Sequence, residues 1–148
     1  KWIEDCLIPE NIDGQNELRR RVPWMTLATG EHWYSPFTFA SAAATKSADI
    51  FQPDIAWVGG LTACLKINAL AEAAGIPVIP HAGMNTPYGQ HFGYAMPNAP
   101  WGEYFLGSPP GVPLDEKNAA TAWGGAASLA MDLSVEDAAD DLLLNEII

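Results

Sequence analysis

The chain has 148 residues, of which 49% are hydrophobic and 17% charged, and its formal net charge at pH 7 is −11. This composition is typical of a folded globular protein rather than a disordered chain. The excess of acidic residues argues against a nucleic acid as partner. The absence of an apolar run long enough to span a bilayer argues against a membrane.

Five short apolar runs are candidate strands. They are apolar on both faces, as parallel strands covered by helices are, and helix-like stretches separate them. The first run reads as the end of a buried strand, so we expect the chain to begin inside a fold. The candidate strands are residues 1–4, 25–29, 50–52, 78–80 and 103–106.

Three stretches between these runs are candidate helices. Ser35 is a suitable N-cap and Pro36 a suitable first-turn residue for a helix over 37–46. The stretch 61–74 has the clearest helical pattern, and Gly75 ends it. A weaker candidate covers 88–96. The apolar residues expected to share a face of the second helix are Leu61, Leu65, Ile67, Leu70 and Ala74.

Strand and helix alternate about four times, which predicts a parallel sheet with right-handed crossovers. Both an open doubly wound sheet and part of a (β/α) barrel have this order. Gly59-Gly60 follows the third run but lacks the spacing of a dinucleotide-binding turn, so the support for a nucleotide site is weak. The stretch 108–113 predicts a loop. Residues 134–148 predict either an acidic helix capped by Ser134 or a loosely ordered tail.

Cys6 and Cys64 are far apart in the sequence and lack metal-type spacing. Such a pair favours two reduced, buried thiols over a disulfide framework, and therefore a cytoplasmic location.

An acid or a histidine lies beside each of the five candidate strands. In a parallel β/α fold the carboxyl ends of the strands meet at one face, where catalytic loops assemble. Each residue alone has an ordinary explanation: an ion-paired loop acid, a turn residue, a core histidine or a solvated acid. Converging carboxylates near buried strands instead favour a hard cation such as Mg²⁺. The five residues are Glu4, Glu31, Asp54, His81 and Glu103.

Several motifs around these residues resemble, in order and spacing, the mandelate racemase branch of the enolase superfamily. The resemblance covers roughly residues 1–113, and the opening Trp-Ile-Glu-Asp-Cys is most similar to that of the L-rhamnonate dehydratases. The motifs are Trp2-Ile3-Glu4-Asp5-Cys6-Leu7-Ile8-Pro9, Thr29-Gly30-Glu31-His32, Gln52-Pro53-Asp54, Ile79-Pro80-His81 and Trp101-Gly102-Glu103-Tyr104-Phe105.

This resemblance implies an α/β fold, a partial TIM-type (β/α) barrel containing strands four to eight of the superfamily's barrel. Residues 1–118 would be the C-terminal portion of that barrel and 119–148 an atypical acidic tail. The implied activity is a carbon–oxygen lyase: Mg²⁺-dependent dehydration of an L-rhamnonate-like sugar acid to a 2-keto-3-deoxy acid through an enediolate. The implied partner is a small sugar acid, and the longer enzyme is expected to be a homo-oligomer.

The resemblance also assigns roles to individual residues. Glu4 and Glu31 would be metal ligands, His81 and Asp54 an acid/base dyad, and Glu103 a stabiliser of the enolate. His32, directly after Glu31, would contact substrate, although a structural role is about equally consistent with its position. In the family a further metal-ligand Asp and a capping domain come earlier in the chain, so this chain alone is expected to be incomplete.

Two alternatives stay open on the sequence. The first is another acid-sugar dehydratase or an epimerase of the same branch. The second is a truncated, non-catalytic remnant that keeps the strands for packing. Outside the motifs, the Arg19–Arg21 run predicts a solvated helix face. The aromatic residues that could line a pocket mouth, with core packing as the default, are Trp33, Tyr34, Trp57 and Tyr88.

Overall fold

The structure is a computed structural model that describes residues 2–105. The predicted loop at 108–113, the predicted tail helix at 134–148 and the division at residue 118 lie outside the described residues.

Three parallel strands form the centre of the fold: β1 (Ile3–Glu4), β2 (Leu27–Thr29) and β3 (Ile50–Phe51). They lie side by side in chain order, with Ile3 opposite Leu27 and Ala28 opposite Ile50. The sequence prediction of these strands is confirmed, although each is shorter than its apolar run.

The fourth and fifth predicted strands are wrong as strands. The fourth is reduced to one parallel bridge between Val78 and Phe51, because Pro77 and Pro80 flank the run and lack the N–H that a ladder needs. Residues 103–105 lie in no strand. Their backbone is paired with a 3₁₀ turn, η1 (Gly83–Asn85), through Glu103 O and Met84 N, rather than with a neighbouring strand.

Within residues 2–105, four α-helices accompany the strands: α1 (Ile12–Arg21), α2 (Pro36–Thr45), α3 (Leu61–Ala74) and α4 (Pro87–Ala95). Side chains cap three of them, since Asn11, Ser35 and Thr86 each accept a hydrogen bond from a first-turn N–H. The predicted cap at Ser35 and the predicted stop at Gly75 are both confirmed. In the described part of the chain, no helix is both long and apolar enough to cross a membrane.

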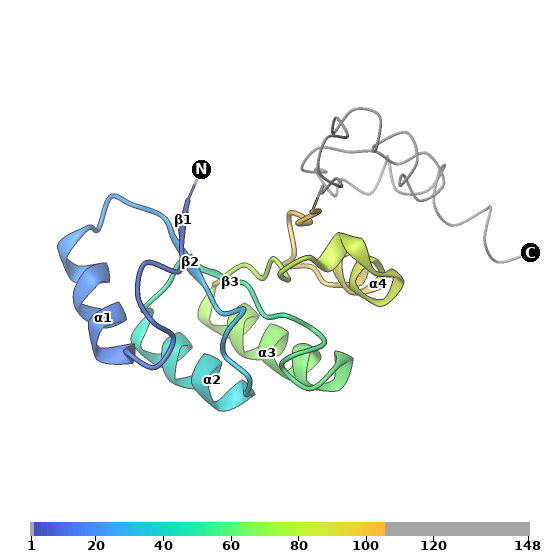
Figure 1. Ribbon diagram of the computed structural model, residues 1–148, viewed down its shortest axis with the longest axis horizontal. Helices are drawn as coiled ribbons and strands as arrows, with labels where there is room; N and C mark the ends of the chain where they lie inside the picture. The colour runs from blue at the N-terminus through green and yellow to red at the C-terminus, as the bar shows by residue number, and fades with distance from the viewer. Residues whose placement is uncertain (1, 106–148) are drawn as a thin grey trace, which may run out of the picture.

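The helices α1, α2 and α3 form a row along one side of the strands, with α4 beyond β3 (Figure 1). The main core lies between the sheet and this row. Phe51 from β3 packs there against Phe39 of α2 and Ile67 of α3. Alternate strand residues face the other way, where Ala28, Ile50 and Ile79 form a second, smaller cluster.

The buried face of α3 differs from the predicted one. Leu61, Leu65 and Leu70 are exposed. Ile67 is buried, as predicted, and the other buried residues are smaller or polar. The buried positions have the i, i+3, i+4, i+7 spacing of one helix face, and they are Cys64, Ile67, Asn68 and Ala71.

The two cysteines also differ from each other. Both are free, as predicted, but Cys64 is buried in α3 whereas Cys6 is exposed in the loop after β1. The prediction of a buried thiol is therefore wrong for Cys6, because the chain leaves the sheet before reaching it.

Candidate active site

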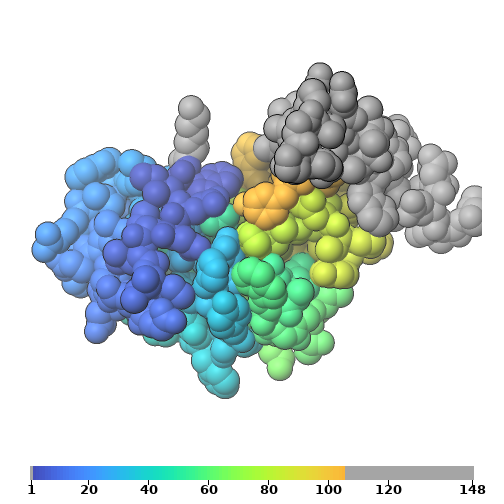
Figure 2. Space-filling view, in the orientation of Figure 1, coloured from blue at the N-terminus to red at the C-terminus, as the bar shows by residue number. Residues whose placement is uncertain are grey.

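The carboxyl-terminal ends of the strands lie together at one edge of the sheet, because the strands are parallel and adjacent. Glu4 is the last residue of β1, while Glu31 and Asp54 follow β2 and β3. His81 follows the bridge residue Val78 in the same way. Figure 2 shows the N-terminal residues (dark blue) and the last described residues (orange) on the same face of the molecule. The edge therefore collects the loops in which the sequence predicts the site.

His81 and Asp54 form a hydrogen-bonded pair. Nδ1 of His81 lies 2.9 Å from Oδ2 of Asp54, and the two side chains are only 14% and 13% exposed. The other carboxylate oxygen of Asp54 accepts hydrogen bonds from the backbone N–H groups of Ala56 (2.8 Å) and Trp57 (2.9 Å). These bonds fix the carboxylate. Because it can only accept, it favours a proton on Nδ1 of His81.

Glu31 lies between two histidines. Its Oε2 is 3.3 Å from Nε2 of His81, and its Oε1 is 3.3 Å from Nδ1 of His32. The same Nδ1 atom is 3.4 Å from Oδ2 of Asp5. The structure thus joins the predicted dyad, the predicted ligand Glu31 and the predicted substrate contact His32 in one continuous network.

Glu103 reaches this network from the far end of the described chain. Its Oε2 accepts a hydrogen bond of 2.6 Å from the backbone N–H of Ala82, next to His81. Burial raises the pKa of the Glu103 carboxyl, and the negative charges of Glu4 and Glu31 act in the same direction; the Ala82 bond and His81 oppose them. A carboxyl shifted in this direction is more readily protonated, and in that form it can donate a hydrogen bond.

Glu4 has different surroundings from Glu31. Its side chain is exposed, and Oε1 accepts hydrogen bonds from Nε1 of Trp2 (2.5 Å) and from Nε2 of the buried Gln52 (3.0 Å). These donors hold the carboxylate at the edge of the sheet. Gln52 is a contributor that the sequence interpretation missed, and the signal was its place two residues before Asp54 at the end of β3.

Asp5 is the second missed residue. Oxygen or nitrogen atoms of Asp5, Glu31 and His32 lie within 4.8 Å of one another, which makes these three the candidate metal-ligand group among the described residues. The sequence analysis considered Glu4 and Glu31 instead. Two successive acids at the end of β1 were the available signal, because a bend there can turn both toward one edge.

Aromatic rings surround the histidines. Trp57 lies 5.7 Å from both His32 and His81, measured between ring centroids, and Phe105 lies 5.1 Å from His81. Trp33, by contrast, is buried in the core. Of the four aromatic residues predicted as possible lining, Trp57 thus contacts the site, while Tyr34 contacts Trp57.

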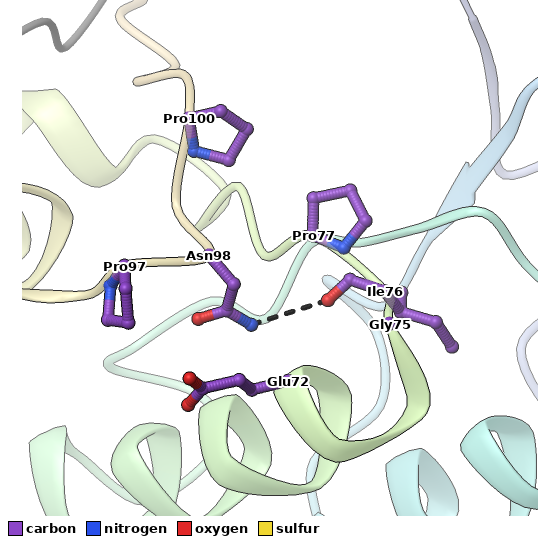
Figure 3. A pocket seen from close by; sticks show the side chains of 7 residues that line it. All are labelled: Glu72, Gly75, Ile76, Pro77, Pro97, Asn98 and Pro100. Carbon is purple, nitrogen blue, oxygen red and sulfur yellow. Dashed lines mark hydrogen bonds between the residues drawn. The ribbon is translucent and has the colours of Figure 1, made fainter.

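Among the pockets formed by the described residues, two lie at opposite ends of the strands. One, of about 400 Å³, is bordered by residues 5–9 and His32 and therefore adjoins the network. The other, of about 300 Å³, lies near the start of the strand run that ends at His81 (Figure 3). Its wall includes Glu72, Pro77 and Asn98, whose Nδ2 donates to Ile76 O. None of the predicted site residues borders this second cavity.

The donor set fits a hard divalent cation. Carboxylates converge at the edge, and oxygen ligands are those that Mg²⁺ prefers. Among the described residues, the arginine ion pairs involve Glu17 and Asp49, so none of them neutralises Glu4, Asp5, Glu31 or Glu103. The pair between Arg19 and Asp49 (3.0 Å) also shows that the Arg19–Arg21 run is more than a solvated face.

The chain is similar to several proteins of known structure or activity. Residues 1–129 match the family model described as Enolase C-terminal domain-like. The chain is 44% identical over 93 residues to an L-rhamnonate dehydratase from Saccharopolyspora erythraea. The aligned residues cover 62% of this chain and 23% of that protein.

Solved structures of dehydratases are also similar to the chain. The crystal structure of L-rhamnonate dehydratase from Gibberella zeae matches with a TM-score of 0.69 at 44% identity, over 73% of this chain and 27% of that one. The structure of rhamnonate dehydratase from the same organism, complexed with Mg, also matches with a TM-score of 0.69. The identity is 43%, over 76% of this chain and 28% of that one. L-Talarate dehydratase from Polaromonas sp. JS666, complexed with Mg and L-glucarate, matches with a TM-score of 0.62 at 36% identity over 70% and 28%.

The chain spans about a quarter of the length of these relatives. The family match nevertheless covers most of the chain, and the parallel α/β fold agrees with it. The chain therefore belongs to the enolase C-terminal domain-like family, in the enolase and mandelate racemase superfamily.

Proposed function

We propose that the chain is part of a longer Mg²⁺-dependent enzyme that dehydrates a sugar acid, with an L-rhamnonate-like acid as substrate. The observation that carries the proposal is the His81–Asp54 pair, whose other ring nitrogen lies 3.3 Å from Glu31, beside carboxylates that no described Lys or Arg pairs with. The similarity to rhamnonate dehydratases supports the substrate class.

We also propose that the chain is part of a (β/α) barrel and covers the positions of strands four to eight of the superfamily's barrel, of which β1, β2 and β3 are the first three. The strict chain order of β1, β2, β3 and Val78 supports this, because an open doubly wound sheet reverses its strand order at a switch point. The single row of α1, α2 and α3 supports it as well (Figure 1).

His81 is the acid/base residue in this proposal. Asp54 holds the proton on Nδ1, so the neutral ring presents Nε2 as the base for the proton α to the substrate carboxylate. Proton transfer puts that proton on Nε2 and leaves an enediolate. The same proton then goes to the β-hydroxyl group, which departs as water, and the enol product tautomerises to a 2-keto-3-deoxy acid.

Glu103 stabilises the charge that develops on the enediolate. In its protonated form the carboxyl donates a hydrogen bond to an enediolate oxygen, which its raised pKa favours. Because the side chains of both His81 and Asp54 are largely buried, few water molecules can reach the dyad.

Glu4 and Glu31 would hold the cation, as the family resemblance assigns them. When bound, Mg²⁺ supplies positive charge near the substrate carboxylate and so stabilises the negative charge of the enediolate. The carboxylates alone provide the binding group, since no described Lys or Arg competes for them through an ion pair.

Calorimetric titration with MgCl₂ tests the metal assignment. We expect Glu31→Gln to weaken binding by at least about tenfold, because it removes one charged ligand. Glu17→Gln is the matched control: the same change on α1, at a glutamate paired with Arg20 and Arg21, should leave the affinity unaltered. Equal affinities in all three proteins contradict the assignment.

Product analysis in the longer enzyme tests the reaction. His81→Asn should lower formation of the 2-keto-3-deoxy acid from L-rhamnonate by about 10²–10⁴-fold, the usual contribution of a general acid/base. Offering L-talarate in parallel distinguishes the alternative substrate that the 36% identical relative suggests. An unchanged rate in His81→Asn contradicts the proposed role.

A further inference from the structure

We propose that Asp5 is a positioning residue that keeps the neutral imidazole of His32 in the tautomer protonated on Nδ1, so that Nε2 faces the substrate as a hydrogen-bond acceptor. The substrate part of this inference rests on the proposed function. The choice of tautomer rests on the geometry of the chain alone.

The backbone of Asp5 holds its carboxylate in an unusual direction. Its φ is 43°, in the left-handed region that Asp and Asn tolerate better than most side chains. Its N–H still donates to Ala28 O (3.2 Å), so the residue remains attached to β2. The left-handed bend directly after β1 turns the side chain toward the loop after β2, where His32 lies.

The carboxylate is then anchored at both oxygens. Oδ1 accepts a hydrogen bond of 2.7 Å from Oγ1 of Thr29, a buried residue at the end of β2. Oδ2 lies 3.4 Å from Nδ1 of His32. Because Thr29 belongs to the sheet, Asp5 connects the imidazole to a rigid element.

Glu31 also faces Nδ1 of His32, at 3.3 Å. Its other oxygen, however, faces His81, and the proposed function gives Glu31 to the cation. Asp5 is then the carboxylate that remains for His32. A carboxylate accepts from Nδ1–H, so Nε2 carries the lone pair in the neutral ring.

The Nε2 atom has room for a ligand. No hydrogen bond engages it within residues 2–105, and His32 borders the cavity of about 400 Å³ formed with residues 5–9. A substrate hydroxyl group is the matching donor. This chemistry also explains why the ring must be held, since the other tautomer presents a donor instead.

Nitrogen-15 NMR of the three histidines in the metal-free chain reads the tautomer directly. At about pH 9, well above the ordinary histidine pKa of roughly 6.5, the neutral rings are observed, and a His32→Gln spectrum assigns the signal. We expect the Nδ1–H form in the wild-type chain. Asp5→Gly, made together with Glu31→Ala so that no second carboxylate faces Nδ1, should shift the signal toward the Nε2–H form, while the backbone keeps a residue suited to positive φ.

Two matched variants isolate the carboxylate. Lys46→Gly also introduces a glycine at a residue with a left-handed backbone conformation (φ 51°). Lys46 lies at the end of α2, remote in sequence, so the variant should leave the His32 signal unshifted. Asp5→Asn keeps an acceptor oxygen and should restore much of the Nδ1–H form. An unfolding curve for each variant verifies that it is folded.

Two outcomes overturn the inference. One is a wild-type His32 already in the Nε2–H form. The other is a His32 signal that is identical in Glu31→Ala with and without Asp5→Gly. MgCl₂ titration separates the roles: a loss of affinity in Asp5→Gly as large as in Glu31→Gln makes Asp5 a metal ligand and refutes positioning. If Mg²⁺ binds to none of the proteins while the tautomer shifts as expected, the proposed function fails and the positioning role stands.

Discussion

Glu103 combines burial with two negative neighbours, and its pKa is raised from the ordinary value of 4.5. Between that value and the raised one, the folded state binds more protons than the unfolded state, so stability falls as pH rises through the interval. Glu103→Gln removes this ionisation. We expect the variant to gain stability relative to the wild type as pH rises through that interval, measured as the urea midpoint in metal-free buffer.

Glu17→Gln is the control for this experiment, and its expected effect on stability has the opposite sign. Hydrogen bonds and charge from Arg20 and Arg21 lower the pKa of Glu17. That stabilisation is present at neutral pH and is lost as pH falls through the lowered pKa. Glu17→Gln should therefore be less stable than the wild type at pH 7 and equal to it at low pH. A Glu103→Gln curve parallel to the wild type at all pH values contradicts the burial argument.

Gly30 follows β2 at a position where a side chain has no space. Its φ is 137°, and an added Cβ would lie 2.7 Å from Cε1 of Phe39 and 3.2 Å from the backbone N of Gln52. We expect Gly30→Ala to lower the free energy of unfolding by about 2–4 kcal/mol, combining backbone strain with overpacking. Urea denaturation at constant pH measures it.

Gly60→Ala separates the two contributions. Gly60 also has a positive φ, 83°, but nothing lies within 4 Å of its added Cβ. This variant should show the backbone strain alone, roughly 1–2 kcal/mol. If the two variants lose the same free energy of unfolding, Phe39 and Gln52 move aside at no cost. That result contradicts the close packing around Gly30, next to Glu31.

Residues at this edge were predictable where their place follows from strand ends alone. Asp54 and His81 each come three residues after a paired strand residue, so a parallel sheet brings them together. Asp5 was not predictable in this way, because its direction depends on a left-handed backbone that no pattern of polar and apolar residues encodes.

At the scale of elements, α3 shows how composition misleads about orientation. Its leucines are strongly hydrophobic, yet Leu61, Leu65 and Leu70 are exposed, and of its large aliphatic side chains Ile67 is the buried one. The inward face is lined by smaller side chains, including Cys64, because α3 lies close to α2. Hydrophobicity alone therefore placed the three leucines on the wrong face, whereas the end of the helix was predicted from Gly75.

The orientation of α3 predicts how the two thiols react. Burial chiefly, with a smaller effect of Asp54, raises the pKa of the Cys64 thiol to about 12, so roughly one thiol in ten thousand is ionised at pH 8. Cys6 is exposed. Iodoacetamide at pH 8 should modify one thiol of the folded chain, Cys6, and both thiols in urea, as counted by mass spectrometry.

Cys6→Ser provides the control for the labelling. This variant should take up no label while folded and one label in urea. Rapid native labelling of Cys64 in Cys6→Ser contradicts the assigned face of α3, because the thiol then faces solvent.

At the scale of the whole molecule, the order of strands and helices was predictable and the extent of the strands was not. In the part of the chain that the structure describes, apolar runs and caps located three strands and three of the four α-helices. The fourth run failed as a strand because prolines limit its pairing, and 103–105 failed because their hydrogen bonds go to the turn at Met84 and Asn85. Tertiary hydrogen bonds of this kind depend on segments far apart in the sequence.

Stability across the sheet should be uneven. β3 and Val78 pack against α2 and α3, whereas both residues of β1 are exposed and β1 pairs on one side within the described sheet. Two amides make a matched comparison, since Gln52 N–H to Thr29 O and Ile3 N–H to Thr26 O are both 3.0 Å long. Their surroundings differ, with Gln52 4% and Ile3 45% exposed.

Hydrogen exchange followed by NMR tests this directly. We expect the Ile3 amide to exchange at least about 100-fold faster than the Gln52 amide, after correction for intrinsic rates, because β1 opens locally without unfolding the core. Rates that rise tenfold per pH unit establish that the measured protection reflects the opening equilibrium. Equal protection of the two amides contradicts the expectation and makes β1 part of the same cooperative unit as β2 and β3. In that case Glu4 and Asp5 are held as rigidly as His81. If the Ile3 amide exchanges faster, as expected, β1 is held less firmly than the rest of the sheet. The order of the site residues on β1 then depends on their hydrogen bonds with Thr29 and Gln52.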